Sequence, residues 1–521
     1  MKPTFRQSMQ WLHTWAGVVL GAVLMAVFWS GTLLVFDREI DRWMAPMTRL
    51  PVIETSTPLD PMIRPFIATA VEVGASSITV ALPYEREPTL RVSFRDVSGL
   101  ARYNLDPGTG RILPDPETAA ATDFLYRFHY SMHIRFANVG IWLVGLAGMA
   151  LLALCVSGIA IHRKILADFF TFRPSKNQRR AILDLHNAAG VLGLPFNVVI
   201  TLSGMIIFYA EYFPSAVRSL YPNAASYYSE IFDSHSRPKS HVPADAISVD
   251  TVRHAAQKIW NGDRIQYLVI NHPGDAAASM RVVRATDNIV LLQGDTAFFD
   301  AATGALLYHR AKPEPVKRAQ GFIAGLHFAQ FQHWTLRWLY FVLGLSGCVM
   351  IATGYVYWVD KRRKRHEQQG LSGVRLVEGL AVGSTTGLII ATLAFFVANR
   401  LLPLGTTFLG YERAALEGWA FYFAWIVTFA HAWLRPRRAW IEQCWWIAAF
   451  AVAAVLLNGI TTGDHLVRSL THRHLWAIAG MDLLLLAGAM VAALAAGKLQ
   501  RRAVAPPASS ARGRPPSDGI E

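Results

Sequence analysis

Apolar runs of about 20 residues recur along the chain, and two long polar stretches separate the first few of them. Each run is long enough to cross a hydrocarbon core roughly 30 Å thick as a helix. The first run is too long for the apolar part of a secretory signal and has no small-residue cleavage motif before Asp37, so we expect it to be retained. The pattern predicts eight spanning helices, near residues 14–36, 138–162, 187–209, 335–358, 376–399, 417–434, 440–460 and 474–497.

The two long stretches between helices, residues 37–135 and 210–333, have a different periodicity. Apolar and polar residues alternate with a period of two between turn-forming residues, which is typical of β-strands. We therefore predict two small α+β domains outside the membrane, one in each stretch. The expected strands include residues 77–82, 90–94, 267–270 and 280–283.

Two apolar runs in the N-terminal part of the chain repeat each other. His13 is followed by Gly17, and His186 is followed by Gly190 at the same spacing of four residues. In both copies a Ser-Gly pair closes the run, and its glycine lies eighteen residues after the histidine. Identical spacing of polar and small residues in otherwise apolar segments indicates a duplicated unit.

A second pair of matched segments extends the duplication into the polar stretches. An Asp-x-x-Thr-Gly motif at residues 106–110 precedes His129, and the same motif at residues 300–304 precedes His327. Aspartate and glycine at these positions are typical of tight turns. Both copies run helix, outer segment, helix from the same side of the membrane, so they form a parallel repeat related by an axis along the membrane normal.

The charges follow the helices. The formal net charge is +14, although only 17% of the residues are charged, against about 25% in an average soluble domain. Basic clusters just outside the apolar runs are typical of cytoplasmic loops, which explains the charge without nucleic acid as a partner. We expect a multi-pass protein of the bacterial inner membrane, with both termini cytoplasmic and the polar stretches periplasmic. The clusters lie at residues 163–164, 173–180, 361–365, 435–438 and 498–502.

The predicted fold is an α-helical membrane protein with two small α+β periplasmic domains. A four-helix bundle built from the two parallel repeats precedes a C-terminal extension of four helices. Three cysteines (Cys155, Cys348 and Cys444) lie in predicted helices without CxxC spacing and are expected to be buried fillers. The parts are residues 1–36 (first helix), 37–135 (outer domain 1), 136–209 (helices 2 and 3), 210–333 (outer domain 2), 334–365 (helix 4), 366–500 (C-terminal helices) and 501–521 (disordered tail).

Four histidines stand where the repeat places membrane helices. Ionisable residues there are rare and usually face the bundle interior. A lone histidine is more often an interhelical hydrogen-bonding residue than a ligand, but two repeat-related pairs favour ligation. The repeat axis predicts that His13 faces His186 at the cytoplasmic side and His129 faces His327 at the periplasmic side. Two facing imidazoles can hold the iron of a haem, and six-coordinate iron suits electron transfer, so we predict two haems and no catalytic side chain.

Other residues near these pairs have more than one interpretation. Gly17 and Gly190 lie on the same helix face as their histidines, where they leave room either for a porphyrin edge or for a closely packed helix. Small-residue pairs at 30–31, 157–158, 203–204 and 353–354 are interpreted as helix packing contacts. The histidines without a counterpart in the repeat are reserve ligands: His162, His133 and His333.

The repeated residues resemble those of the PepSY-associated transmembrane family, which includes iron-regulated inner-membrane proteins and ferric-siderophore reductases. The resemblance covers about residues 1–365, and it implies b-type haem and reduction of siderophore-bound iron at the periplasmic face. It implies no role for the C-terminal helices. The matching motifs are His13-x-x-x-Gly17, Asp184-Leu185-His186-x-x-x-Gly190, the turn at 103–110 and Gly325-Leu326-His327.

The leading functional hypothesis is therefore a transmembrane ferric reductase. Electrons enter at the His13–His186 haem and leave from the His129–His327 haem, where a ferric siderophore or another periplasmic iron chelate docks between the outer domains. Cytoplasmic loops of about 15–25 residues are too short for a dinucleotide-binding domain, so the donor is quinol or a separate soluble reductase. Alternatives are a quinol-linked cytochrome for another periplasmic acceptor and a non-redox permease or anchor for PepSY-type regulatory domains. Candidate contacts for an anionic chelate are Arg135, Arg337 and Tyr130.

Overall fold

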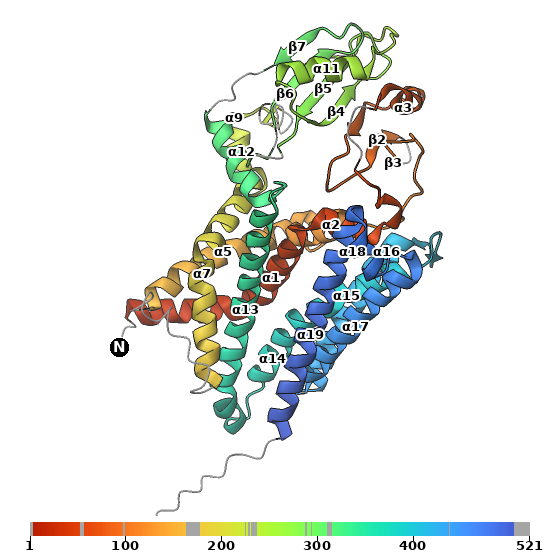
Figure 1. The fold of residues 1–521 in the computed structure, drawn as a ribbon. Helices are drawn as coiled ribbons and strands as arrows, with labels where there is room; N and C mark the ends of the chain where they lie inside the picture. Colours follow the sequence, from red (N-terminus) through yellow and green to blue (C-terminus); the bar gives the residue numbers. More distant parts are fainter. Residues whose placement is uncertain are drawn as a thin grey trace, which may run out of the picture.

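A computed structural model shows a helical membrane part with a β-sheet domain at one end (Figure 1). Within the described residues, seven helices are long and apolar enough to cross a membrane. Their number and composition support a multi-pass membrane protein. The structure describes residues 4–52, 57–96, 99–162, 178–223, 226–227, 230, 237–286, 289–292, 294–309, 315–436 and 438–504.

The two repeats build a four-helix bundle. Helix α1 packs against both α5 and α13, and α7 packs against the same two helices. The helices correspond to the first four predicted spans, but α1 begins nine residues before the predicted start at residue 14. His13 and His186 consequently lie within their helices, not at the helix starts that the sequence indicated. The bounds are α1 Phe5–Leu34, α5 Val139–Ile161, α7 Gln178–Ile207 and α13 Trp334–Gln368.

The C-terminal helices stand beside this bundle (Figure 1). Helices α14 and α15 together form one candidate span, interrupted at Thr385. Helix α16 coincides with the sixth predicted span, but it carries Arg413 and Glu417 and is not among the seven apolar candidates, so the count of eight stays a prediction. The bounds are α14 Gly373–Ser384, α15 Thr386–Leu401, α16 Arg413–Leu434, α17 Ala439–Thr462, α18 Leu466–Thr471 and α19 Trp476–Val504.

The chain end differs in part from the prediction. Helix α19 continues to Val504, so the first residues of the segment predicted as a disordered tail are helical. Residues 505–521 lie outside the described residues. Of the cysteines, Cys348 and Cys444 are buried and Cys155 is partly exposed, and all of them are free thiols, as their spacing predicted.

Both polar stretches contribute to one antiparallel sheet of seven strands, in the order β3-β2-β1-β4-β5-β6-β7. The sequence predicted a separate domain in each stretch. The structure joins them through β1 and β4, with Ile78 opposite Ile270, because pairing satisfies the backbone groups of two edges that would otherwise be open. The strands are β1 Ser77–Ala81, β2 Leu90–Asp96, β3 Gly99–Leu105, β4 Ile265–Asn271, β5 Ser279–Arg284, β6 Thr296–Asp300 and β7 Leu306–His309.

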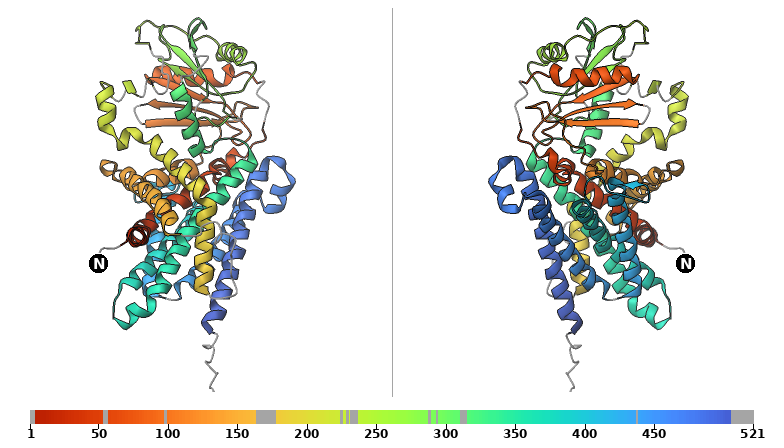
Figure 2. Two further views of the ribbon diagram at one scale, coloured as in Figure 1. Left: turned by 90° about the vertical axis from the view of Figure 1, so that its left-hand side faces the viewer. Right: turned by 90° about the vertical axis from the view of Figure 1, so that its right-hand side faces the viewer.

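One face of the sheet is covered by α3 (Asp60–Glu72) and α11 (Val249–Ile259), which lie on the side away from the membrane helices (Figure 2). Alternate strand residues such as Val80 and Leu268 pack under these helices into a single buried core. The two predicted turns are present: in the second, Gly304 has φ +74° and its N–H donates to the carbonyl of Asp300. The period-two prediction of strands is therefore confirmed, and both copies share one core.

Short elements connect the sheet to the bundle. Helix α2 follows α1, a π-helix precedes α4, and α12 precedes α13. A tiny hairpin of β8 and β9 links α15 to α16. The bounds are α2 Asp37–Met44, π-helix Ala120–Leu125, α4 Tyr126–Ser131, α8 Tyr209–Tyr212, α9 Pro214–Leu220, α12 Pro315–Phe328, β8 Thr407–Phe408 and β9 Tyr411–Glu412, with 3₁₀ turns at Pro46–Thr48, Phe136–Asn138 and Arg473–Leu475.

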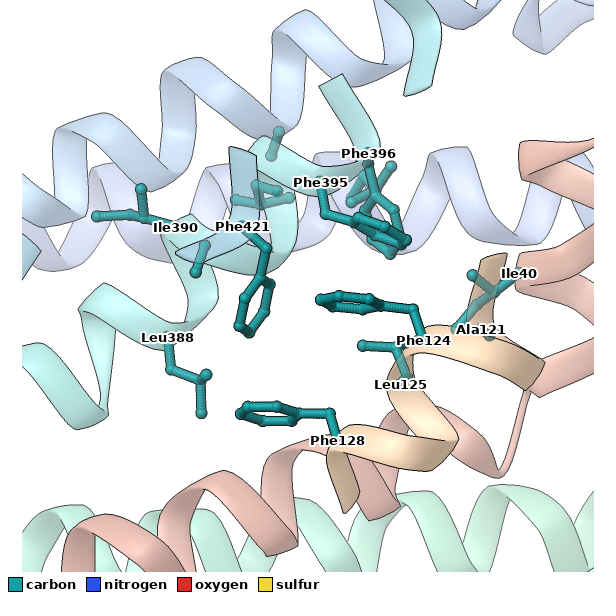
Figure 3. Packing of buried hydrophobic residues seen from close by; sticks show 14 of the residues in the cluster. Ile40, Ala121, Phe124, Leu125, Phe128, Leu388, Ile390, Phe395, Phe396 and Phe421 are labelled. Carbon is teal, nitrogen blue, oxygen red and sulfur yellow. The ribbon is translucent and has the colours of Figure 1, made fainter. Parts of the chain in front are cut away.

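An aromatic cluster attaches the first outer segment to the C-terminal helices (Figure 3). Phe124 stacks on Phe395 of α15 with ring centres 4.6 Å apart, and Phe128 meets Phe421 of α16 edge-on at 5.2 Å. Such pairs are stabilised by ring electrostatics in addition to burial. The cluster holds α4, the short helix that carries His129.

Candidate functional site

The four histidines of the repeat form two facing pairs. The ring centres of His13 and His186 lie 6.3 Å apart with planes at 88°, and those of His129 and His327 lie 6.0 Å apart with planes at 40°. Each pair takes one histidine from each copy of the repeat. The structure therefore brings together the residues that the sequence paired.

The separation of the rings matches two imidazoles that share one metal ion. A transition-metal ion lies about 2.0 Å from an imidazole nitrogen, and that nitrogen lies about 1.1 Å from its ring centre, so opposed ligands have ring centres about 6.2 Å apart. Opposed imidazoles may rotate about their common axis, and the two different interplanar angles are both compatible with ligation. Within the described ranges, no group of three or more His, Cys, Asp or Glu side chains lies together as a metal site.

Each histidine is oriented by a backbone carbonyl. His327 Nδ1 lies 2.8 Å from the carbonyl oxygen of Ile200 in α7. Because a carbonyl oxygen only accepts, Nδ1 carries the hydrogen and Nε2 is left with a free lone pair. Metal-ligating histidines are commonly held in this way. The other three bonds are His129 to Val27 (3.0 Å), His13 to Leu154 (3.1 Å) and His186 to Met350 (2.8 Å).

A hydroxyl-bearing residue and a glycine complete each histidine's cradle. For His327, Ser203 Oγ lies 3.2 Å from Nδ1, and a Cβ added at Gly204 would lie 2.7 Å from the ring. Only glycine lets the ring approach the helix so closely. These pairs were expected to be helix packing contacts, but the structure places them against the histidine rings. The equivalent cradles are Ser30–Gly31 for His129, Ser157–Gly158 for His13 and Thr353–Gly354 for His186.

A cavity surrounds the outer pair. It encloses about 360 Å³ between α1, α5, α7 and α13, and both His129 and His327 line it. Its walls are mainly apolar, and Arg38 and Tyr126 are among the polar residues that line it. Burial lowers the pKa of His129, and burial together with the charge of His129 lowers the pKa of His327 to about 4. Both imidazoles are therefore neutral at ordinary pH, the form that binds a metal.

The glycines next to the inner histidines contact helices. A Cβ at Gly17 would lie 3.8 Å from Leu154, and one at Gly190 would lie 3.4 Å from Met350. These are contacts with side chains of α5 and α13. Of the two interpretations that the sequence left open, the observed contacts correspond to helix packing.

The reserve histidines are outside both pairs. His133 uses both ring nitrogens, since Nδ1 lies 2.8 Å from the Tyr422 hydroxyl and Nε2 lies 2.9 Å from the Phe124 carbonyl. His162 caps the end of α5, and His333 is an exposed residue at the start of α13. The repeat symmetry had disfavoured all of them.

One predicted contact for an anionic chelate is wrong. Arg337 is fully buried, and its guanidinium donates to the Val35 carbonyl and to Glu39. It therefore caps the end of α1 and is closed to a ligand. Tyr130 lines the outer cavity, and Arg135 is exposed beyond α4.

Comparison with known proteins identifies the family. The model of the PepSY-associated TM region matches residues 10–361, more than half of the chain, and the chain belongs to this family. A curated relative, an uncharacterised protein of Pseudomonas aeruginosa, is 28% identical over 301 residues, which cover 54% of this chain and 73% of the relative. The region that the family model matches includes all four paired histidines.

Proposed function

We propose that this member of the PepSY-associated family is a di-haem b-type electron-transfer protein that reduces ferric iron, held in siderophores, at the periplasmic face of the inner membrane. The observation that supports this most strongly is the repeated site. Within each of the two pairs, the histidine rings lie at a distance that suits one shared metal ion. Every histidine has the same kinds of neighbour: a carbonyl, a hydroxyl and a glycine. Interhelical packing alone does not require four histidines in two matched pairs, each with the same three kinds of neighbour.

The protein's contribution is to hold and shield the cofactor. Bound haem supplies a centre that takes up and releases one electron at a time. His129 and His327 would hold the outer haem and His13 and His186 the inner one, each histidine fixed in one tautomer by its carbonyl acceptor. The hydrogen bond to Nδ1 also raises the basicity of Nε2 toward the iron. The apolar walls of the outer cavity exclude water from the haem faces.

The two sites lie far apart along one helix. Helix α1 carries both His13 and Ser30, which belongs to the outer cradle, and these residues are about 26 Å apart along the helix axis. We propose that electrons pass over this separation from the His13–His186 site to the His129–His327 site.

Electron balance defines the partners. A quinol, or a soluble cytoplasmic reductase, supplies electrons to the inner site, and oxidation of one quinol releases two electrons and two protons. Each ferric ion takes one electron, so one quinol reduces two ferric ions. Ferrous iron is held less firmly by hard oxygen ligands, and its release from the siderophore follows.

Haem content of the purified protein tests the proposal. After expression with ample haem, we expect about two haems per chain by pyridine haemochrome and a dithionite-reduced α-band. His186→Ala should lose the inner haem and keep the outer one. A colourless protein, or an unchanged ratio in His186→Ala, contradicts the proposal and favours a structural role for the histidines. Reoxidation by a periplasmic electron acceptor but not by ferric chelates would indicate a quinol-linked cytochrome.

A further inference from the structure

The sheet face opposite α3 and α11 carries a set of arginines, here called the arginine face: Arg91, Arg95, Arg102 and Arg281. Strand pairing places them on one side, since Arg102 is opposite Ser93, Ser93 is opposite Thr79, and the row continues through Val269 to Arg281. Between them β1 presents only small side chains, namely Ser77, Thr79 and Ala81. The arginines therefore lie on either side of a strip of small side chains, where the two copies of the repeat join.

The positive charge on the arginine face is only partly balanced by acidic partners. Arg91 pairs with Glu87 at 2.8 Å, and Arg102 pairs with Asp123 at 2.6 Å, but both arginine side chains stay substantially exposed. Arg95 is exposed, and neither Arg95 nor Arg281 has an acidic partner in the part of the chain that the structure describes. Arg281 lies over the ring of Tyr267 at 5.8 Å, which orients the guanidinium without neutralising it.

Two charge bridges connect the arginine face to the outer histidine pair. Glu87 pairs with Arg91 and also lies 3.5 Å from Arg38, one of the residues that line the cavity. Asp123 pairs with Arg102 and also lies 3.8 Å from Arg127 in α4, two residues before His129. Ion pairs therefore link the arginine face to a residue that lines the cavity of His129 and His327 and to the helix that carries His129.

We infer that the arginine face is the docking surface for the ferric chelate and that it selects chelates of net negative charge, such as those built on carboxylate, catecholate or phenolate groups. Guanidinium groups bind such oxygens with paired, charge-assisted hydrogen bonds. A concentrated positive field also raises the encounter rate of anions. A neutral chelate gains neither effect. The inference rests on the proposed function for the fate of the bound iron, but the binding it describes can be measured alone.

Binding is tested with gallium(III) citrate, an anionic chelate that accepts no electron, by calorimetry on the full-length protein in detergent. In the double variant Arg95→Glu, Arg281→Glu we expect the Kd to rise by at least about tenfold, because charge-assisted bonds are replaced by repulsion. The control is Lys258→Glu, which reverses one positive charge on an exposed residue of α11, on the other side of the sheet. Equal affinities in the double variant and the wild type overturn the inference whether or not haem is present.

Electron transfer separates this inference from the proposed function. Haem-loaded protein, reduced with dithionite and freed of excess, is mixed with ferric citrate or with cationic hexaammineruthenium(III). The double variant should be reoxidised at least about tenfold more slowly by ferric citrate and no more slowly by the cation. Equal slowing with both oxidants means damaged haem sites and contradicts a charge-selective face. Wild-type protein that holds no haem, or that no ferric chelate reoxidises, defeats the proposed function while the gallium result stands.

Discussion

His129 and His327 occupy equivalent positions of the repeat, but different parts of the chain support the helices that carry them. The segment before and after His129 is held by the C-terminal helices through Phe124, Phe128 and the bond from Tyr422 to His133. The helix of His327 is held by its own outer segment, where the Leu292 N–H donates to the Gly321 carbonyl. The cradle was duplicated, but the support is different: the described contacts hold the first copy's segment against the C-terminal helices and the second copy's helix against its own outer segment.

Removal of either outer histidine is the largest test of the shared cradle. We expect His129→Ala and His327→Ala each to reduce haem from about two per chain to about one. In either variant a single imidazole remains at the outer site, and one protein ligand is too few to retain the haem there. Pyridine haemochrome against protein concentration measures this. If the two variants differ strongly in haem content, the copies are not equivalent at the metal.

A buried ion cluster that joins the two copies is the next test: Glu39 and Arg86 come from the first copy and Arg337 from α13 of the second. Glu39 accepts from both Arg86 and Arg337, at 2.9 and 2.6 Å. Glu39→Gln leaves these arginines short of counter-charge in a buried site and should destabilise the fold by about 3–5 kcal/mol. Thermal unfolding in detergent measures the loss. A similar loss in the control Asp360→Asn, whose pair with Arg179 is half exposed, would show that the position is not special.

The same cluster predicts a pH dependence. Burial alone would raise the pKa of Glu39, but Arg86 and Arg337 outweigh it and lower the pKa from 4.5 to about 2. A lowered folded-state pKa contributes stability that is complete above the ordinary pKa and is lost as the pH falls toward the folded value. We expect the melting temperature to fall between about pH 4.5 and pH 2, and less steeply in Glu39→Gln.

The same substitution, glycine to alanine, can be made next to His129 and next to His327, and its effects in the two copies can be compared. A Cβ at Gly31 would lie 2.8 Å from His129, and one at Gly204 would lie 2.7 Å from His327. Substitution by alanine should displace each ring at a cost of about 1–3 kcal/mol and lower outer haem occupancy. Alanine at Gly17, which meets only ordinary contacts, is the control. Because the C-terminal helices support the segment around His129, we expect Gly31→Ala to displace His129 less than Gly204→Ala displaces His327, and to retain more haem. Lower haem retention in Gly31→Ala than in Gly204→Ala would contradict a supporting role for the C-terminal helices.

The smallest effect is expected at the contact between the C-terminal helices and the segment around His129. The Tyr422 hydroxyl donates to His133, so Tyr422→Phe should cost about 1 kcal/mol and loosen the turn after α4. Electron paramagnetic resonance of the oxidised protein should show a shifted outer haem and an unchanged inner haem. Tyr209→Phe, on the other copy, removes a hydroxyl that has no hydrogen-bond partner among the described residues and does not line the outer cavity, so it should shift neither signal.

Periodicity predicted most elements because their burial is local in origin. The apolar runs at residues 138–162 and 440–460 became α5 and α17 within two residues, and the alternating segment at 267–270 became part of β4. Helix α16 coincides with a predicted span but is not among the seven apolar candidates, and its polar residues are paired with distant neighbours: Glu417 accepts from Thr118 and Asn399. No local pattern shows that Thr118 will be present.

The sequence by itself determined which histidines belong together, because duplication preserves spacing and a parallel repeat must place equivalent residues about one axis. Tertiary structure alone decided what surrounds them. The carbonyls of Val27 and Ile200, the Ser-Gly cradles and the union of two outer segments in one sheet all join residues far apart in the chain. Such contacts depend on how helices and strand edges meet in space, and a one-dimensional pattern records the spacing of residues along an element but not which neighbour each face will find.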